Sequence, residues 1–176
     1  MRIDRENTTA LVIDYQEKLV PVMSEKERLI HDSEILLKGL RELGIPMTIT
    51  QQYTKGLGTT VTEITDAVGH EAYIDKISFS AFDCVKEKIQ GKKFVIVCGI
   101  ETHICVLQTV VDLAANGYIS VVVEDCVSSR KESDKRVALQ RMREEGAIVT
   151  TYESVLFELL KVAGTEESKR IQRLIK

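Results

Sequence analysis

The chain has 176 residues, of which 44% are hydrophobic and 29% are charged, and its formal net charge is −3. This length suits one domain with a sizeable core, so we expect a single domain over residues 1–176. The weak negative charge gives no reason to expect a nucleic acid or an anionic membrane as a partner. No apolar run approaches the roughly 18 residues that a membrane helix needs.

The predicted elements alternate along the whole chain. Strands are predicted at residues 8–13, 46–51, 71–75, 93–98, 119–123 and 147–151. Helices are predicted over residues 27–43, 103–116, 133–145, 153–162 and 166–175. Gly44 and Pro46 end the first helix, and Thr102 is a candidate N-cap for the second.

Runs that are apolar throughout, such as Val95-Ile96-Val97, are what a parallel sheet covered on both faces requires. Alternating strands and helices with right-handed crossovers give a three-layer α/β/α fold. We therefore predict an α/β domain with a mostly parallel six-stranded sheet, Rossmann-like in its architecture.

Chemistry-bearing residues stand just after three of the predicted strands. In open parallel sheets, sites form at the carboxyl ends of the strands where the strand order reverses. Asp14 follows the first strand and is either a base or a cap of the next segment. Lys76 is either a surface lysine or a cation that favours a thiolate. Cys105 comes after a glycine turn, in the expected first turn of a helix, where the helix dipole stabilises a thiolate. A base, a cation and a thiol together predict a nucleophilic-cysteine hydrolase.

The turn before Cys105 supplies further candidates. The backbone N–H groups of Glu101 and Cys105 could form an oxyanion hole, with the Glu101 side chain solvated or near the mouth of the site. His103 is another candidate base, although a histidine two residues before the cysteine at a helix start usually points elsewhere. After the second strand, Gln52 and Tyr53 either face a substrate or belong to an inert surface loop.

The four cysteines, at positions 84, 98, 105 and 126, have neither a CxxC pair nor the spacing of a disulfide framework. Such thiols suit a reducing compartment. The segment Met1–Glu6 is too charged for a signal peptide. We therefore predict a cytoplasmic protein.

These motifs resemble those of the isochorismatase-like cysteine hydrolase family, which includes nicotinamidases and N-carbamoylsarcosine amidases. The matching stretches are Leu11–Gln16, Lys76 with Ser78–Phe82, and Gly99–Val106. The resemblance implies a catalytic triad of Asp14, Lys76 and Cys105, and a cis peptide bond between Ile100 and Glu101 that turns the Glu101 N–H towards the oxyanion. It also implies a homo-oligomer (dimer, tetramer or octamer). Gln16 and Phe82, within the matching stretches, are candidate pocket residues together with Gln52 and Tyr53.

One departure from the family pattern concerns metal binding. Nicotinamidases of the family carry an Asp-x-His metal motif after the second strand, where this chain has Gln52-Tyr53-Thr54. The stretch is similar to a small metal-free branch, the isochorismatase domain-containing proteins. We therefore expect no metal and no cofactor, and a small amide or carbamoyl substrate cleaved through a thioester. Two alternatives stay open: vinyl-ether hydrolysis of isochorismate, which does not need the thiol, and a non-catalytic oligomeric scaffold.

Overall fold

Six parallel strands form one sheet in the computed structural model, which describes residues 1–176. The strands are β1 (Thr8–Ile13), β2 (Met47–Gln52), β3 (Tyr73–Lys76), β4 (Phe94–Ile100), β5 (Ile119–Ser128) and β6 (Ile148–Thr150). Their order across the sheet is β3-β2-β1-β4-β5-β6, and every neighbouring pair is parallel. The predicted fold class is therefore confirmed.

Eight α-helices connect or follow the strands. They are α1 (Lys26–Glu42), α2 (Thr54–Leu57), α3 (Thr62–Val68), α4 (Phe82–Ile89), α5 (Leu107–Ala115), α6 (Glu132–Glu144), α7 (Tyr152–Leu160) and α8 (Glu166–Ile175). A 3₁₀ turn covers Val20–Val22, and a π-helical turn, Thr102–Val106, leads into α5. The helices α2, α3 and α4 are additions to the predicted elements, and β5 runs five residues beyond its predicted end at residue 123.

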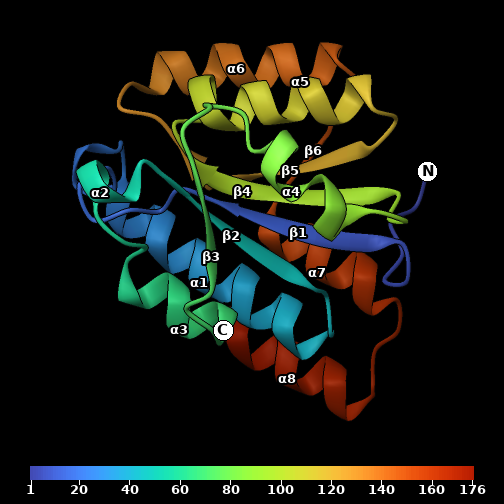
Figure 1. The fold of residues 1–176 in the computed structure, drawn as a ribbon. Helices are drawn as coiled ribbons and strands as arrows, with labels where there is room; N and C mark the ends of the chain where they lie inside the picture. Colours follow the sequence, from blue (N-terminus) through green and yellow to red (C-terminus); the bar gives the residue numbers. More distant parts are fainter.

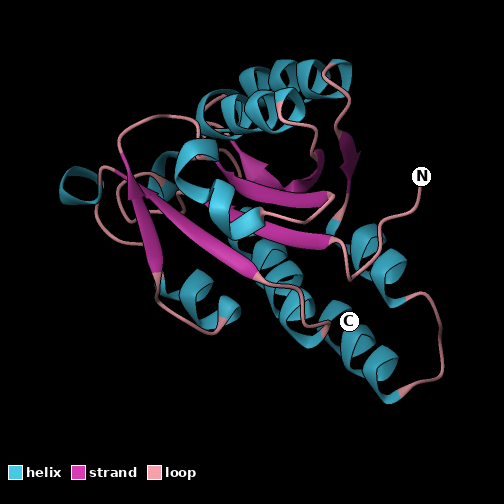
Figure 2. Ribbon diagram, turned by 45° about the vertical axis from the view of Figure 1, so that its right-hand side comes forward, coloured by secondary structure: helices cyan, strands magenta, loops and turns pink.

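The sheet lies between two layers of helices, as Figures 1 and 2 show. Helices α1, α3, α7 and α8 cover one face, and α4, α5 and α6 cover the other (Figure 1). Alternate residues of β1 enter the two cores: Ala10 and Val12 pack on the α1 side, and Leu11 and Ile13 on the α5 side. Burial on both faces explains why the central strands are apolar throughout. Each fully buried aliphatic side chain of Val or Leu size contributes roughly 1.5–3 kcal/mol.

The strand order reverses between β1 and β4. From β1 the chain builds outward through β2 to β3, and from β4 it builds outward on the other side through β5 to β6. Ile13 pairs in register with Gly99, so the residues that follow β1 and β4 leave the sheet side by side. The carboxyl ends of these two strands are thus the place where a site is expected.

The two ends of the chain are tied together on the α8 side. The Ile3 N–H donates to Glu158 at 2.8 Å, and Arg5 Nη2 lies 2.6 Å from Glu167 Oε2. No helix of this structure combines the length and the apolar character that crossing a bilayer demands.

Candidate active site

A buried ion pair joins the ends of β1 and β3. Asp14 follows β1 with a φ of +59°, a left-handed conformation that aspartate tolerates better than most residues, and its side chain is fully buried. Lys76 ends β3 and is 4% exposed. Its Nζ lies 2.7 Å from Asp14 Oδ2, and the Thr50 hydroxyl donates to Asp14 Oδ1 at 2.8 Å. Two of the three residues proposed from the sequence are therefore in direct contact.

Three further acceptors surround the Lys76 ammonium. Its Nζ donates to Gln52 Oε1 at 2.7 Å, to the Phe79 carbonyl at 2.9 Å and to the Ser78 carbonyl at 3.2 Å. Together with Asp14 Oδ2 at 2.7 Å, four oxygens therefore lie within reach of the three hydrogens of the ammonium, and the charged carboxylate is the strongest acceptor among them.

The turn between β4 and α5 brings Cys105 to the same place. Gly99 has a φ of +151°, and a Cβ at this position would stand 2.5 Å from the Ile13 carbonyl oxygen and 2.6 Å from Ile13 Cβ. Only glycine allows β4 to pass this closely beside β1. Glu101 then turns the chain with a φ of +49°, and Cys105 lies in the π-helical turn that follows, 4% exposed.

Two predictions about this turn were wrong. The chain contains no cis peptide bond, so the Ile100–Glu101 bond is trans. Positive φ values at Gly99 and Glu101 turn the chain here with this bond in the trans form. Thr102 is not an N-cap: Glu101 occupies the capping position, and Thr102 is fully buried with no partner for its hydroxyl.

The electrostatics of Cys105 also differ from the prediction. Burial raises the pKa of the Cys105 thiol to about 12, the negative charge of Asp14 adds to the rise, and the Lys76 charge opposes it. The helix dipole was expected to lower this pKa, but Cys105 lies inside a π-helical turn and next to two carboxylates. The thiol therefore rests in its neutral form, and a nucleophilic sulfur requires a base that takes the proton during attack.

Glu101 is buried, whereas a solvated or mouth position was expected. The residue is 8% exposed, and Arg130 Nε lies 2.8 Å from its Oε1. The backbone N–H of Glu101 donates to no acceptor in the protein. That N–H is available to a negatively charged oxygen, as an oxyanion hole requires.

The His103 ring contacts Glu101 and residues around the start of α6. Its Nδ1 lies 2.8 Å from Ser129 Oγ and 3.5 Å from Glu101 Oε2, and its Nε2 lies 3.9 Å from Asp134 Oδ2. The ring therefore packs against the segment that joins β5 to the start of α6.

Unpaired polar atoms concentrate in this region. Glu101 Oε2 and Thr102 Oγ1 are buried without a hydrogen-bond partner, and Asp14 Oδ2 has only the Lys76 ammonium beside it. Buried polar atoms are nearly always paired in folded proteins, so a cluster of unpaired ones calls for an explanation. A polar ligand bound beside Cys105 would supply one.

The four predicted pocket residues lie in different environments in the structure. Gln16 is fully buried, and its amide joins Gln52 to the Gly58 carbonyl, so it has no atom left for a ligand. Gln52 orients Lys76 and donates to the Ile77 carbonyl at 2.7 Å. Tyr53 is half exposed. Phe82 packs edge-on against Tyr118, with 6.2 Å between ring centroids.

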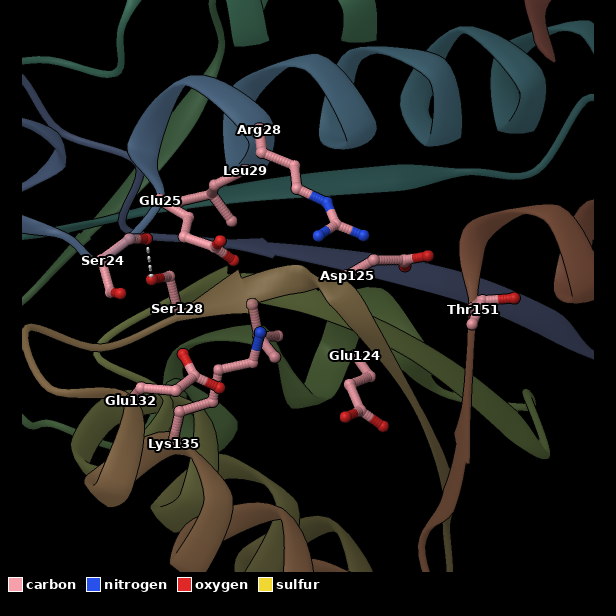
Figure 3. A pocket seen from close by; sticks show the side chains of 11 residues that line it. Ser24, Glu25, Arg28, Leu29, Glu124, Asp125, Ser128, Glu132, Lys135 and Thr151 are labelled. Atoms are coloured by element: carbon pink, nitrogen blue, oxygen red, sulfur yellow. Dashed lines mark hydrogen bonds between the residues drawn. The ribbon is translucent and has the colours of Figure 1, made fainter.

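A polar pocket of about 310 Å³ lies farther along the same edge of the sheet, between the start of α1, the end of β5 and the start of α6 (Figure 3). Ser128 and Glu132 line it, and the Ser128 hydroxyl donates to the Ser24 carbonyl. Asp14, Lys76 and Cys105 are not among its lining residues. The pocket is therefore separate from the buried ion pair.

Sequence reasoning missed two supporting residues. Thr50 holds Asp14, and the Thr109 hydroxyl donates to the Cys105 carbonyl at 2.7 Å while it accepts from the Ala81 N–H. Thr50 lies two residues before Gln52 on β2, which was a usable signal, because side chains two apart share a face of a strand. Thr109 follows Cys105 by four residues, the spacing of one helical turn.

A protein-family model, the isochorismatase domain, matches residues 8–154. The chain belongs to the isochorismatase family. Members of this family are hydrolases, and the match spans the two central strands and the turn that carries Cys105.

Curated members of the isochorismatase family resemble this chain along almost its full length. The secreted isochorismatase effector Isc1 of Phytophthora sojae is 36% identical over 184 residues, which cover 99% of this chain and 87% of that protein. Isochorismatase domain-containing protein 2A of Mus musculus is 36% identical over 178 residues, covering 99% of this chain and 85% of that protein.

Solved isochorismatase-fold structures agree with the architecture. The MAR1 ribonuclease from Caenorhabditis elegans has a TM-score of 0.94 and 36% sequence identity, covering 99% of this chain and 92% of that chain. The YcaC gene product of Escherichia coli, described as an octameric hydrolase of unknown specificity, has a TM-score of 0.85 and 24% identity, covering 92% of this chain and 83% of that chain. The latter likeness concerns the fold alone.

Proposed function

We propose that this isochorismatase-family chain is a cysteine-dependent hydrolase of a small amide or carbamoyl compound. The observation that carries the proposal is the buried Asp14–Lys76 pair next to the Cys105 thiol, whose pKa responds to both charges. A buried carboxylate beside a neutral thiol is suited to accept its proton. The free N–H of Glu101 supplies the donor that acyl transfer requires.

The proposed reaction has two steps. The Cys105 sulfur attacks the carbonyl carbon while Asp14 takes the thiol proton, and the backbone N–H groups of Glu101 and Cys105 hold the oxyanion. The C–N bond then breaks, and Asp14 returns the proton to the leaving nitrogen. Water attacks the thioester with Asp14 as base, which releases the acid and restores the thiol. Lys76, whose Nζ lies 2.7 Å from Asp14 Oδ2, holds Asp14 in place throughout.

Two other functions for this fold make different demands on the thiol. Vinyl-ether hydrolysis of isochorismate would not need Cys105, and a scaffold of the same fold would need none of the three residues. Neither accounts for a thiol beside the buried Asp14–Lys76 pair or for the backbone N–H of Glu101 that donates to no acceptor. A ribonuclease, as the C. elegans structure is named, would need a surface for RNA, and the net charge of −3 does not favour one.

We also propose a homo-oligomer of two, four or eight copies in a cytoplasmic setting. Exposed apolar side chains gather around the edge strand β3, at Tyr53, Tyr73, Ile77 and Phe79, and four free thiols suit a reducing compartment. The octameric state is a property of the E. coli neighbour, and secretion is a property of the Phytophthora relative. Sedimentation of the purified chain measures its assembly.

The test is a panel of small amides, carbamoyl compounds and isochorismate, assayed with the wild-type chain and two cysteine variants. Cys105→Ala should reduce amide turnover by about three orders of magnitude or more and retain the native circular dichroism. Cys84→Ala removes a half-buried thiol on α4 and should keep full activity. Isochorismate cleavage that survives Cys105→Ala would establish the vinyl-ether reaction instead. No turnover together with an unreactive Cys105 would establish the scaffold.

A further inference from the structure

The segment that joins β3 to α4 holds the buried lysine with its carbonyl groups. The Ser78 and Phe79 carbonyls accept from Lys76 Nζ at 3.2 and 2.9 Å. The Ile77 carbonyl accepts from the Gln52 amide at 2.7 Å, and the Gln52 oxygen accepts from Lys76 Nζ, also at 2.7 Å. The position of the Lys76 ammonium therefore depends on the conformation of this segment.

The same segment is open to solvent on its outer side. The side chains of Ile77 and Phe79 are 70% and 54% exposed. The backbone N–H groups of residues 77–80 donate to no backbone acceptor. Exposed apolar side chains and unused donors on one short segment are typical of a surface that another chain covers.

Two tyrosines extend this surface along the edge of the sheet. β3 is the outermost strand (Figure 1), and Tyr73 at its start is 45% exposed. Tyr53 is 50% exposed, and its N–H donates to the Lys76 carbonyl at 2.8 Å, which places it beside the end of β3. Four of the nine exposed large hydrophobic side chains thus lie together, on what we call the β3 face: Tyr53, Tyr73, Ile77 and Phe79.

The area of the β3 face suits the centre of an interface between two copies of the chain. An aromatic side chain carries roughly 150–250 Å² of surface, so three half-exposed rings and an isoleucine leave about 400 Å² uncovered. A standard interface covers about 800 Å² on each partner, with an apolar centre and a polar rim. Two β3 faces in contact would supply such a centre.

The charges beside the β3 face also favour a second copy as the partner. Lys55 and Asp75 are exposed, and Asp75 accepts from the N–H of Thr54, the neighbour of Lys55, at 2.9 Å. A two-fold interface brings the same surface against itself. A surface that carries both a cation and an anion at its rim can therefore pair with its own copy.

We propose that the β3 face is the contact between two copies of this chain, and that the second copy completes the Lys76 environment by covering residues 77–80. In the assembled protein the covered segment keeps its carbonyl groups on the ammonium beside Asp14. In the separate chain the segment is free to move, and Lys76 is held less firmly. Assembly then regulates the site, and this part of the inference rests on the proposed role of Lys76.

The experiment follows the wild-type chain by sedimentation velocity and by amide hydrogen exchange over a wide range of protein concentration. The wild type should associate, and the amides of residues 77–80 should exchange at least about tenfold more slowly in the assembled protein than in the dilute, separate chain. Amide turnover per chain should fall on dilution in the same concentration range.

Three variants test the face itself. Phe79→Ser should raise the dissociation constant by about thirtyfold or more, the effect of losing a central interface side chain, and should keep the native circular dichroism. Phe79→Leu retains an apolar side chain and should stay within about threefold of the wild type. Val137→Ser removes a side chain on α6 that is 61% exposed, and should change neither association nor exchange.

The possible failures are distinguishable. A chain that is monomeric at every concentration, or an assembly that Phe79→Ser leaves intact, refutes the β3 face as the contact. Assembly through this face with unchanged exchange at residues 77–80 refutes its effect on the Lys76 environment. Sedimentation and exchange do not require turnover, so an inactive wild type would refute the proposed hydrolase, whereas these two measurements would still decide the β3 contact.

Discussion

Replacing Lys76 by methionine should destabilise the protein strongly. The change keeps the length of the side chain but removes the ammonium that lies 2.7 Å from Asp14 Oδ2. Asp14 is fully buried, and its only remaining hydrogen-bond partner would be the Thr50 hydroxyl on Oδ1. Removal of one member of a buried pair typically costs about 3–5 kcal/mol, because the other charge is left unpaired. Urea unfolding followed by circular dichroism measures this loss.

Two matched variants test the reasoning behind that magnitude. Adding Asp14→Asn to Lys76→Met removes the stranded charge and should recover about 2 kcal/mol of the loss. Lys86→Met breaks a pair with Asp83 at 3.2 Å on the surface, where both side chains are mostly exposed, and should cost less than about 1 kcal/mol. If Lys76→Met costs no more than Lys86→Met, or if the double variant is the less stable one, the buried pair does not have the role described.

Three further outcomes are expected. Gly99→Ala should lower the free energy of unfolding in urea by about 3 kcal/mol or more, since its Cβ would meet the Ile13 backbone. Gly117→Ala, which has open space at a φ of +81°, should lower it by about 1 kcal/mol. Equal losses in the two variants would contradict this. Burial raises the pKa values of Cys98 and Cys105 to about 12, so the stability from these neutral thiols is complete below about pH 8.5 and declines above it; a urea midpoint that holds to pH 11 would count against this. Iodoacetamide should modify Cys105 about tenfold faster per pH unit with no plateau below about pH 11, and a plateau near neutrality would show a preformed thiolate.

Sequence patterns predicted what depends on local periodicity and sheet geometry. Apolar runs identified the six strands, and the carboxyl ends of β1 and β3 then placed Asp14 and Lys76 at one edge, where they touch. The rest depends on residues distant in the chain. Gln16 looked free to meet a ligand, but its partners are Gln52 at the end of β2, 36 residues away, and Gly58, 42 residues away in a loop whose path the sequence does not show.

The state of the thiol could not be predicted from position alone. A helix start favours a thiolate, and that reasoning omitted the burial and the two carboxylates around Cys105. Glu101 shows the same limit, because its partner Arg130 comes from the loop after β5. Short helices were missed for a different reason: α3 has seven residues, too few for a clear helical period.

The strand order has a consequence for how the protein folds during its synthesis. Asp14 leaves the ribosome early, yet β1 can pair with β4 only after about 80 further residues have been made, and Cys105 follows β4. Pairing between strands this distant in the chain is slow, and until β4 has been made one edge of β1 has no strand partner. The proposed nucleophile and its base therefore meet only when the two halves of the sheet have joined. A chain that ends before β4 has no assembled site, so chemistry at Cys105 would report that β1 and β4 have paired.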